Sequence, residues 1–65
     1  MKKIRRHDIV TLENGEEGKV LNEVIISGVR ILEIEITASK QIEYVIESKL
    51  TLKKQWFWNL LADKL

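Results

Sequence analysis

The chain has 65 residues, of which 45% are apolar and 32% charged, and eleven Lys and Arg against ten Asp and Glu leave a formal net charge of +1. A chain this short supports one small core, because it buries only about 60% of the surface that its extended form exposes. With no cysteine and a single histidine, it has no disulfide bridge and no conventional zinc or histidine cluster, and we expect no metal and no cofactor.

The chain opens with a basic segment, residues 1–7, in which no acid accompanies the bases Lys2, Lys3, Arg5 and Arg6. Residues 8–18 follow with four acids and no base. Charge that changes sign along the chain predicts separate basic and acidic patches on the folded surface.

A first hairpin is predicted over residues 8–26, where apolar residues alternate with the two-residue period of half-buried strands. In residues 8–13, Val10 and Leu12 share a face. Asn14-Gly15 then predicts a tight turn in which both positions have positive φ. The second strand, 18–26, places Val20, Val24 and Ile26 on one face and Leu21, Glu23 and Ile25 on the other.

Three further strands follow a second predicted turn at Ser27-Gly28. Residues 31–37 alternate most clearly, with Leu32, Ile34 and Ile36 on one face. Residues 42–47 form a strand with two different faces, either of which could be buried. One face carries Ile42, Tyr44 and Ile46, and the other carries Glu43, Val45 and Glu47. Leu50 and Leu52 indicate a short fifth strand.

From residue 53 the pattern changes to that of a helix of about ten to twelve residues. Trp56 and Phe57 stand four positions before Leu60 and Leu61, whereas Trp58 lies off this stripe. An isolated helix this short is marginal in water, so it must dock. It either plugs an open end of the β-structure or offers its aromatic face to a partner or a second copy.

Five short strands with turns between them predict a small all-β barrel or sandwich. A closed or nearly closed barrel also removes the edges that isoleucine-rich strands would expose.

Two segments carry a resemblance to a known superfamily. HDIVTLENGEEGKVL (7–21) resembles the opening of KOW-type and related bacterial Src-homology-3-like barrels, in which an Asp-hydrophobic-Val strand, a polar turn and a Gly-x-Val strand follow one another. YVIESKLTLKK (44–54) resembles their ending, where Tyr-Val leads through a tight helical turn into Leu-x-Leu. Together the segments cover 26 of the 65 residues.

This resemblance implies a five-stranded Src-homology-3-like barrel at 8–52. With the basic arm at 1–7 and a short C-terminal α-helix at 53–65, which such a barrel does not require, the chain is expected to form one domain. The resemblance also implies that Gly18 allows close strand packing or a bulge. The implied core consists of Val10, Leu12, Val20, Leu32, Ile34 and Ile36. Two features depart from the pattern: the first loop is shorter than in ribosomal KOW proteins, and His7 replaces the glycine that commonly precedes the aspartate.

Catalysis is not expected. His7 and Asp8 are neighbours whose side chains would point to opposite faces of a strand, which works against a catalytic pair. Glu33 and Glu35 share a strand face, but we expect that face to be exposed to solvent. The glycines lack the Lys-Ser/Thr of a phosphate loop. Proline-peptide recognition needs several aromatic walls, and Tyr44 is the one aromatic residue in the predicted barrel.

Binding to protein is the first functional hypothesis. Trp56, Phe57 and Trp58 are consecutive, and consecutive helical residues sweep about 200°, so the three cannot all face one core. We expect Trp58 to face solvent or a partner, and tryptophan is enriched at interface hot spots. The predicted protein-interaction residues, Tyr44 included, point to a protein partner or a homo-oligomer.

Nucleic-acid binding is the alternative hypothesis. In such barrels the termini often lie close, so two basic clusters would converge into one electrostatic footprint. The predicted contact residues are Lys2, Lys3, Arg5, Arg6, Lys49, Lys53 and Lys54.

Membrane association is the weakest alternative. The Trp-rich segment with its flanking lysines has some features of an interfacial helix. The longest stretch without a charged residue, 55–62, is far below the ~20 residues that span a bilayer, and the basic N-terminus lacks the apolar block of a secretory signal. We expect a small soluble cytoplasmic protein, of the kind found among accessory proteins of phages and other mobile elements.

Overall fold

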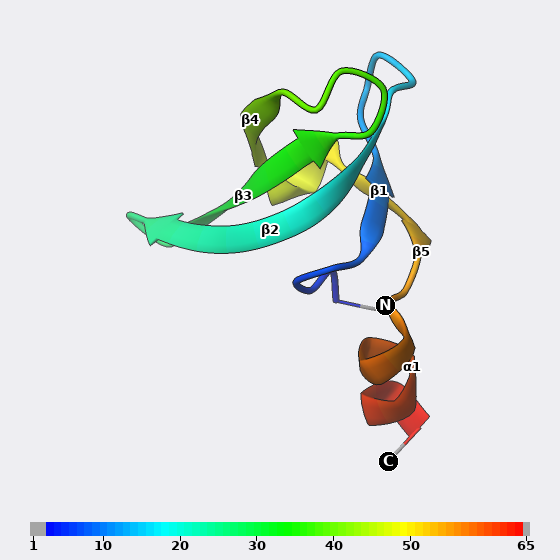
Figure 1. Cartoon of the computed structure of the whole chain (residues 1–65). Coiled ribbons are helices and arrows are strands. Elements are labelled where there is room, and N and C mark those ends of the chain that lie inside the picture. Colours follow the sequence, from blue (N-terminus) through cyan, green and yellow to red (C-terminus); the bar gives the residue numbers. More distant parts are fainter. Residues whose placement is uncertain (1–2, 65) are drawn as a thin grey trace.

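The computed structural model describes residues 3–64, with side chains to residue 62. Five antiparallel strands form one sheet in the order β4-β3-β2-β1-β5, and a short helix follows (Figure 1). The elements are β1 (Ile9–Thr11), β2 (Glu17–Ile26), β3 (Val29–Ile36), β4 (Ile42–Ile46), the 3-10 turn η1 (Glu47–Lys49), β5 (Thr51–Lys54) and α1 (Phe57–Lys64). The predicted β-rich chain with a C-terminal helix is confirmed. None of its described helices is both long and apolar enough to cross a membrane.

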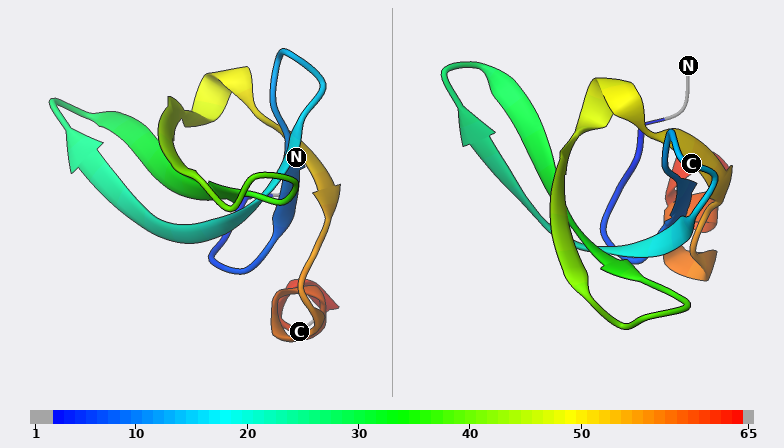
Figure 2. Two further views of the ribbon diagram at one scale, coloured as in Figure 1. Left: turned by 45° about the horizontal axis from the view of Figure 1, so that its top comes forward. Right: turned by 90° about the horizontal axis from the view of Figure 1, so that it is seen from above.

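The sheet is strongly curved, and its concave face holds the core (Figure 2). The buried apolar side chains are Ile4, Val10, Leu12, Val20, Leu32, Ile34 and Ile36. Partly buried Val45, Leu50 and Leu52 pack against them. Six of these seven buried residues are the predicted core. The seventh, Ile4, lies in the segment predicted only as a basic arm, so that segment also contributes to the core.

A bulge in β2 overturns the predicted faces of that strand. Val20 pairs with Ile34, but the next pair along the ladder is Asn22 with Glu33, so Leu21 is the extra residue. An extra residue shifts the alternation by one position. Glu23 therefore shares the face of Leu32, and Val24 pairs with Ile31 on the outer face. The prediction that Val20 and Val24 share a face is wrong for this reason.

The two predicted turns differ in outcome. Ile26 pairs with Val29, and Ser27 and Gly28 between them have φ of 51° and 78°, which confirms the second turn. At the first, the backbone N–H of Gly15 donates to Leu12 O at 2.9 Å, and Gly15 has φ 90°. Asn14 is not among the residues with positive φ, so the predicted two-residue turn is wrong. The N–H of Leu12 donates to Glu16 O, and such a three-residue loop needs positive φ only at its last position.

Gly18 allows two strands to approach closely, as expected. A Cβ added there would lie 2.3 Å from Ile34 Cγ2 and 3.1 Å from the backbone oxygen of Glu35. A side chain at position 18 would thus displace a core residue.

The helix is shorter than predicted and does not plug the sheet. Residues 51–54 are a strand, because they pair with β1, and α1 begins only at Phe57. Phe57 and Trp58 are each 61% exposed, and α1 projects beyond the sheet in Figure 1 and in the left view of Figure 2. The residues that pack against the buried core are Val45, Leu50 and Leu52, and none of them belongs to α1.

The buried face of β4 is now assigned. Val45 pairs with Leu32 and packs against the core. Ile42, Tyr44 and Ile46 consequently lie on the outer face, where they are 44%, 65% and 40% exposed.

Candidate interaction groove beside the C-terminal helix

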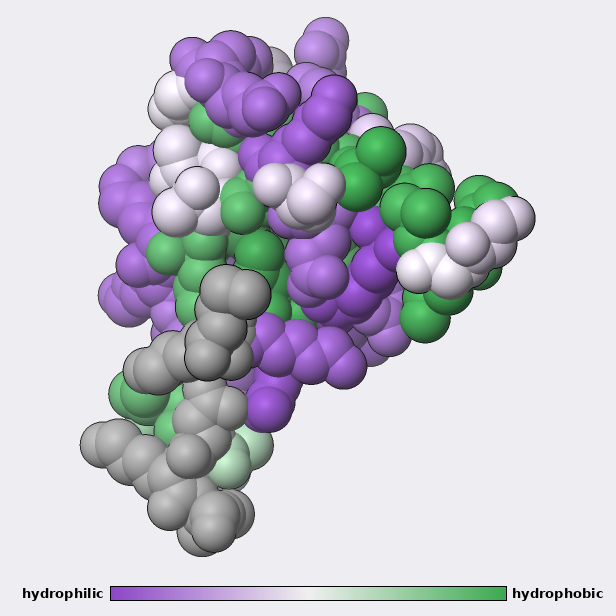
Figure 3. All heavy atoms as spheres, turned by 180° about the vertical axis from the view of Figure 1, so that it is seen from behind, coloured by the Kyte–Doolittle hydropathy of each residue, from purple (hydrophilic) through white to green (hydrophobic). Residues whose placement is uncertain are grey.

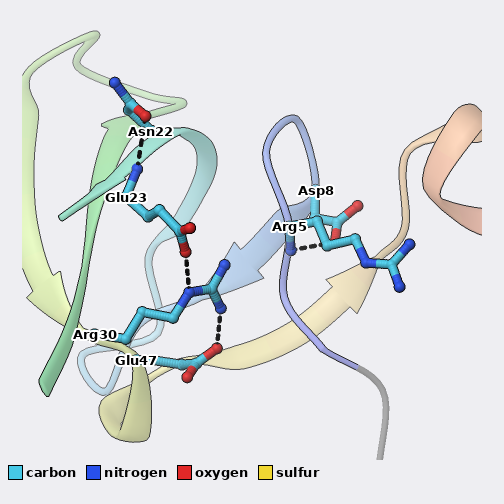
Figure 4. Close-up of polar contacts among 6 residues, drawn as sticks. All are labelled: Arg5, Asp8, Asn22, Glu23, Arg30 and Glu47. Carbon is cyan, nitrogen blue, oxygen red and sulfur yellow. Dashed lines mark hydrogen bonds and ion pairs between the residues drawn. The ribbon is translucent and has the colours of Figure 1, made fainter. Parts of the chain in front are cut away.

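A buried carboxylate fixes the position of α1. Asp8 is completely buried, and its Oδ2 accepts a hydrogen bond from the Arg5 backbone N–H at 2.9 Å (Figure 4). Its Oδ1 accepts from the backbone N–H of Trp56 at 2.7 Å and from Asn59 Nδ2 at 2.8 Å. One side chain therefore joins the N-terminal turn to the first turn of the helix, in the manner of a capping residue supplied from another segment.

Asn59 makes the second connection. Its Nδ2 also donates to the backbone oxygen of Arg6 at 2.8 Å. The helix is thus held at its first turn by polar contacts, whereas its aromatic and leucine side chains remain largely uncovered.

The aromatic side chains form a cluster that begins at His7. The His7 backbone has φ 75° and donates its N–H to Val20 O at 2.7 Å. Its ring lies 5.1 Å from that of Trp56, centroid to centroid. Trp56 lies 6.3 Å from Trp58, which meets Phe57 edge-to-face at 5.3 Å. Trp58 faces solvent as expected, but so do Phe57 and, at 40% exposure, Trp56.

Two lysines flank an isoleucine next to this cluster. Ile9 pairs with Lys19 of β2 on one side and with Lys54 of β5 on the other. Directly paired residues share a face, so the three form one cross-strand row. A register shift in the β1–β5 ladder brings Lys54, rather than Lys53, opposite Ile9.

The row lines one groove of about 530 Å³ together with the aromatic cluster except Trp58. Its lining residues are His7, Ile9, Lys19, Lys54, Gln55, Trp56, Phe57 and Leu60. This interaction groove has an apolar aromatic floor, two lysines and no acid among those residues. Such a surface suits a ligand that combines an apolar group with negative charge.

The basic arm lies elsewhere. Lys3, Arg5 and Arg6 line a second hollow of about 290 Å³ together with Glu23 and Arg30. Arg30 forms ion pairs with both Glu23 and Glu47 (Figure 4). Burial alone would lower the pKa of Arg30, but its bonds to the two carboxylates outweigh burial and raise it. The bond from Arg30 lowers the pKa of Glu23. The arm thus lies beside a network that contains acids.

The other predicted nucleic-acid contacts are dispersed. Lys53 forms an ion pair with Glu17. Lys49 lines a hollow that also includes Glu13 and Glu43. Lys54 alone of the predicted set lies in the interaction groove, and Lys2 lies outside the described residues. The predicted lysines therefore do not converge into one cluster.

The predicted interaction residues divide between two surfaces. Trp56, Phe57 and Trp58 stay together, but Tyr44 lies on β4, at the other end of the strand order from β5 and α1. The Tyr44 hydroxyl donates a 3.1 Å hydrogen bond to Glu33 Oε2.

Sequence reasoning missed Ile9, Lys19, Asp8 and Asn59. The first two join the site through strand register and the last two through contacts about fifty positions apart. The one sequence signal for the buried carboxylate was the position of Asp8, directly before the apolar residues of β1. No group of three or more metal-binding side chains occurs within the described part of the chain.

Comparison with protein-family models, with curated proteins and with solved structures finds no match for this chain.

Proposed function

We propose that the curved sheet is a Src-homology-3-like barrel that acts as a non-catalytic protein-interaction module. The strand order, the 3-10 turn η1 between β4 and β5 and the bend of β2 at its bulge support the fold assignment. The two segments that resemble such barrels supply β1, the first half of β2, and the run from β4 to β5.

The observation that carries the function is the exposure of the aromatic cluster at a helix whose first turn is held by Asp8 and Asn59. Three aromatic residues remain 40–61% exposed, although a buried aspartate holds the helix start in place. Uncovered tryptophans on a preorganised support are typical of interface anchors, because little conformational entropy is lost on binding.

The partner is a peptide segment with an aromatic or aliphatic anchor and neighbouring carboxylates. The anchor packs against Trp56 and Phe57, and the carboxylates pair with Lys19 and Lys54. Both lysines border the groove, and its lining contains no acid that would repel such a ligand.

Selection from a displayed peptide library with the full chain as bait tests this proposal. We expect enrichment of peptides in which Asp or Glu flanks an aromatic or branched residue. Phe57→Ala and Lys54→Glu should each weaken binding of the selected peptides roughly tenfold or more. Lys40→Glu is the matched control, because it makes the same charge change in the β3–β4 turn, outside the groove. No enrichment, or equal losses from Lys54→Glu and Lys40→Glu, would contradict the proposal.

Single-stranded nucleic acid is a second candidate ligand for the same groove. Lys19 and Lys54 next to Trp56 and Phe57 combine phosphate-binding and base-stacking groups. If both lysines contact phosphates, log K should fall with log salt at a slope of about −1.4 for a single strand. Titration of a labelled oligonucleotide at several salt concentrations checks this, and a slope near zero or no binding at low salt excludes it.

A further inference from the structure

The outer edge of β4 has an open backbone. Ile36 N–H donates to Gln41 O at 2.8 Å, in the same register as the β3–β4 ladder. Hydrogen-bonded pairs alternate with non-bonded pairs in an antiparallel ladder. Glu43 and Val45 therefore bond to β3, whereas the N–H and C=O groups of Ile42, Tyr44 and Ile46 point away from it. Ile46 is the N-cap of η1, so its C=O accepts the first bond of that turn. Among the described residues, none of the other outward groups bonds to another segment.

This edge lacks most of the devices that prevent strand pairing. Residues 42–46 contain no lysine and no proline, and their ladder has no bulge. The opposite edge strand, β5, carries Lys53, Lys54 and a register shift. Natural sheets protect free edges with lysines and bulges, so the chain protects one edge and leaves the other open.

The side chains next to the open edge form an apolar outer surface. Ile46 continues over β3 and β2 into Ile31 and Val24. Tyr44 and Ile42 instead lie beside Glu33 and Glu35 of β3. The projecting end of the β2–β3 hairpin extends this surface, and Figure 3 shows its green apolar atoms. Exposed apolar residues there include Val24, Ile26 and Val29.

We propose that two copies of this chain pair through β4, antiparallel about a twofold axis at Tyr44. Because the outward backbone groups occur at every second residue, Tyr44 then opposes Tyr44 of the second copy and Ile42 opposes Ile46. Both backbone groups of Tyr44 then bond across the axis, the N–H of each Ile46 bonds to the C=O of Ile42 in the other copy, and the sheet becomes continuous over ten strands. On the outer face each cross-strand pair is apolar, which stabilises antiparallel pairing.

The charges favour a second copy in this register. Glu43 is the one charged residue within β4, and it lies on the inner face because it pairs with Ile34. In the twofold arrangement it opposes Val45 of the second copy, and Glu47 opposes Gln41. No like charges lie directly opposite each other in this register, although the two Glu43 side chains are diagonal neighbours across the axis.

Disulfide trapping tests the register directly, since the chain has no cysteine of its own. In a hydrogen-bonded antiparallel pair the Cα atoms are about 5.5 Å apart, within the range of a disulfide. Tyr44→Cys should therefore form a covalent dimer rapidly under mild oxidation. Glu33→Cys is the matched control: it lies opposite Tyr44 on β3, and its counterpart would be about 15 Å away across the interface. Equal trapping of the two variants overturns the proposal.

Analytical ultracentrifugation of the full chain provides the second test. We expect a wild-type dimer whose dissociation constant rises roughly tenfold or more in Tyr44→Lys, because two lysines then face each other at the axis. Trp58→Lys, on the exposed side of α1, should leave the dimer intact. A wild-type monomer, a dimer lost in Trp58→Lys alone, or a ring of three or more copies formed by β4–β5 pairing would each overturn the proposal. Peptide binding by Tyr44→Lys is measured as well. If this monomeric variant still binds peptides in the interaction groove, dimerisation and the proposed function are tested independently.

Discussion

The carboxylate of Asp8 accepts a 2.7 Å hydrogen bond from the backbone N–H of Trp56, 48 residues further along the chain. Hydrogen bonds from the Arg5 backbone N–H and from Asn59 Nδ2 to the same carboxylate complete a buried junction between the two ends of the described chain. No buried side-chain nitrogen or oxygen among the described residues is left without a partner. The position of the exposed helix thus depends on one core carboxylate.

Replacement of Asp8 should be among the most destabilising changes in the chain. Asp8→Ala leaves the N–H groups of Arg5 and Trp56 without their acceptor, which costs about 3 kcal/mol. A domain this small has a total stability of about 3–5 kcal/mol. Urea unfolding followed by far-UV circular dichroism measures the loss. Glu13→Ala, an exposed acid in the first hairpin loop, should change stability by less than about 0.5 kcal/mol. Similar losses in both variants would contradict the anchoring role.

Gly18→Ala should destabilise the sheet by about 1–3 kcal/mol, because its Cβ meets Ile34 Cγ2 at 2.3 Å. The same substitution should cost clearly less in an Ile34→Ala background, which removes the clashing methyl group. A double-mutant cycle of urea midpoints measures this coupling. Additive effects would show that the clash does not determine the requirement for glycine.

The pKa of Tyr44 should lie above its usual value of about 10. The hydrogen bond to the Glu33 carboxylate, together with the charge of that carboxylate, raises it. The bond stabilises the folded state while the phenol is protonated, below the unfolded pKa, and this stabilisation is lost as pH rises through the folded pKa.

Tyr44 is the only tyrosine in the chain, so ultraviolet absorbance of the phenolate reports its titration alone. Glu33→Gln should return the midpoint toward the usual value. Glu35→Gln, two residues away on the same face of β3, should leave it raised. A midpoint that is the same in all three proteins would exclude the Glu33 interaction as the cause.

Both tryptophans should be accessible to a soluble quencher, with Trp58 more accessible than Trp56. Trp58 is 61% exposed and Trp56 40% exposed, with its ring against His7. Iodide quenching of wild type and of Trp58→Phe, which retains only Trp56, separates the two contributions. Weak quenching of the wild-type protein would show that the aromatic cluster is covered in solution. Trp58→Ala should change stability by less than about 0.5 kcal/mol, because the side chain supports no core contact.

Local alternation predicted the five strands and most of the core. Val10, Val20 and Leu32 each belong to a run in which apolar and other residues alternate along one strand. This alternation depends only on neighbouring residues, and it correctly predicted that the three are buried. The same rule placed Val24 on the wrong face, because the bulge at Leu21 is defined by the pairing of β2 with β3. The alternation of residues within β2 carries no information about how β2 pairs with β3.

For the candidate site, too, local sequence predicted some residues and strand pairing decided the others. Helix geometry alone predicted that the consecutive residues Trp56, Phe57 and Trp58 could not all be buried, and their exposed fractions of 40–61% agree with this. The helix start was placed too early, because residues 51–54 become a strand only through their ladder with β1. Basic residues were chosen by proximity in sequence, whereas Lys19 and Lys54 meet through their shared partner Ile9.

The sequence by itself determined a single unstapled core, five strands and an aromatic C-terminal helix, because composition and periodicity act over a few residues. Tertiary structure alone decided which charges meet, which face of β4 is buried and where the helix is held. Those outcomes depend on register and on contacts such as Asp8 to Trp56, and the energy of a buried carboxylate is defined only once distant donors surround it.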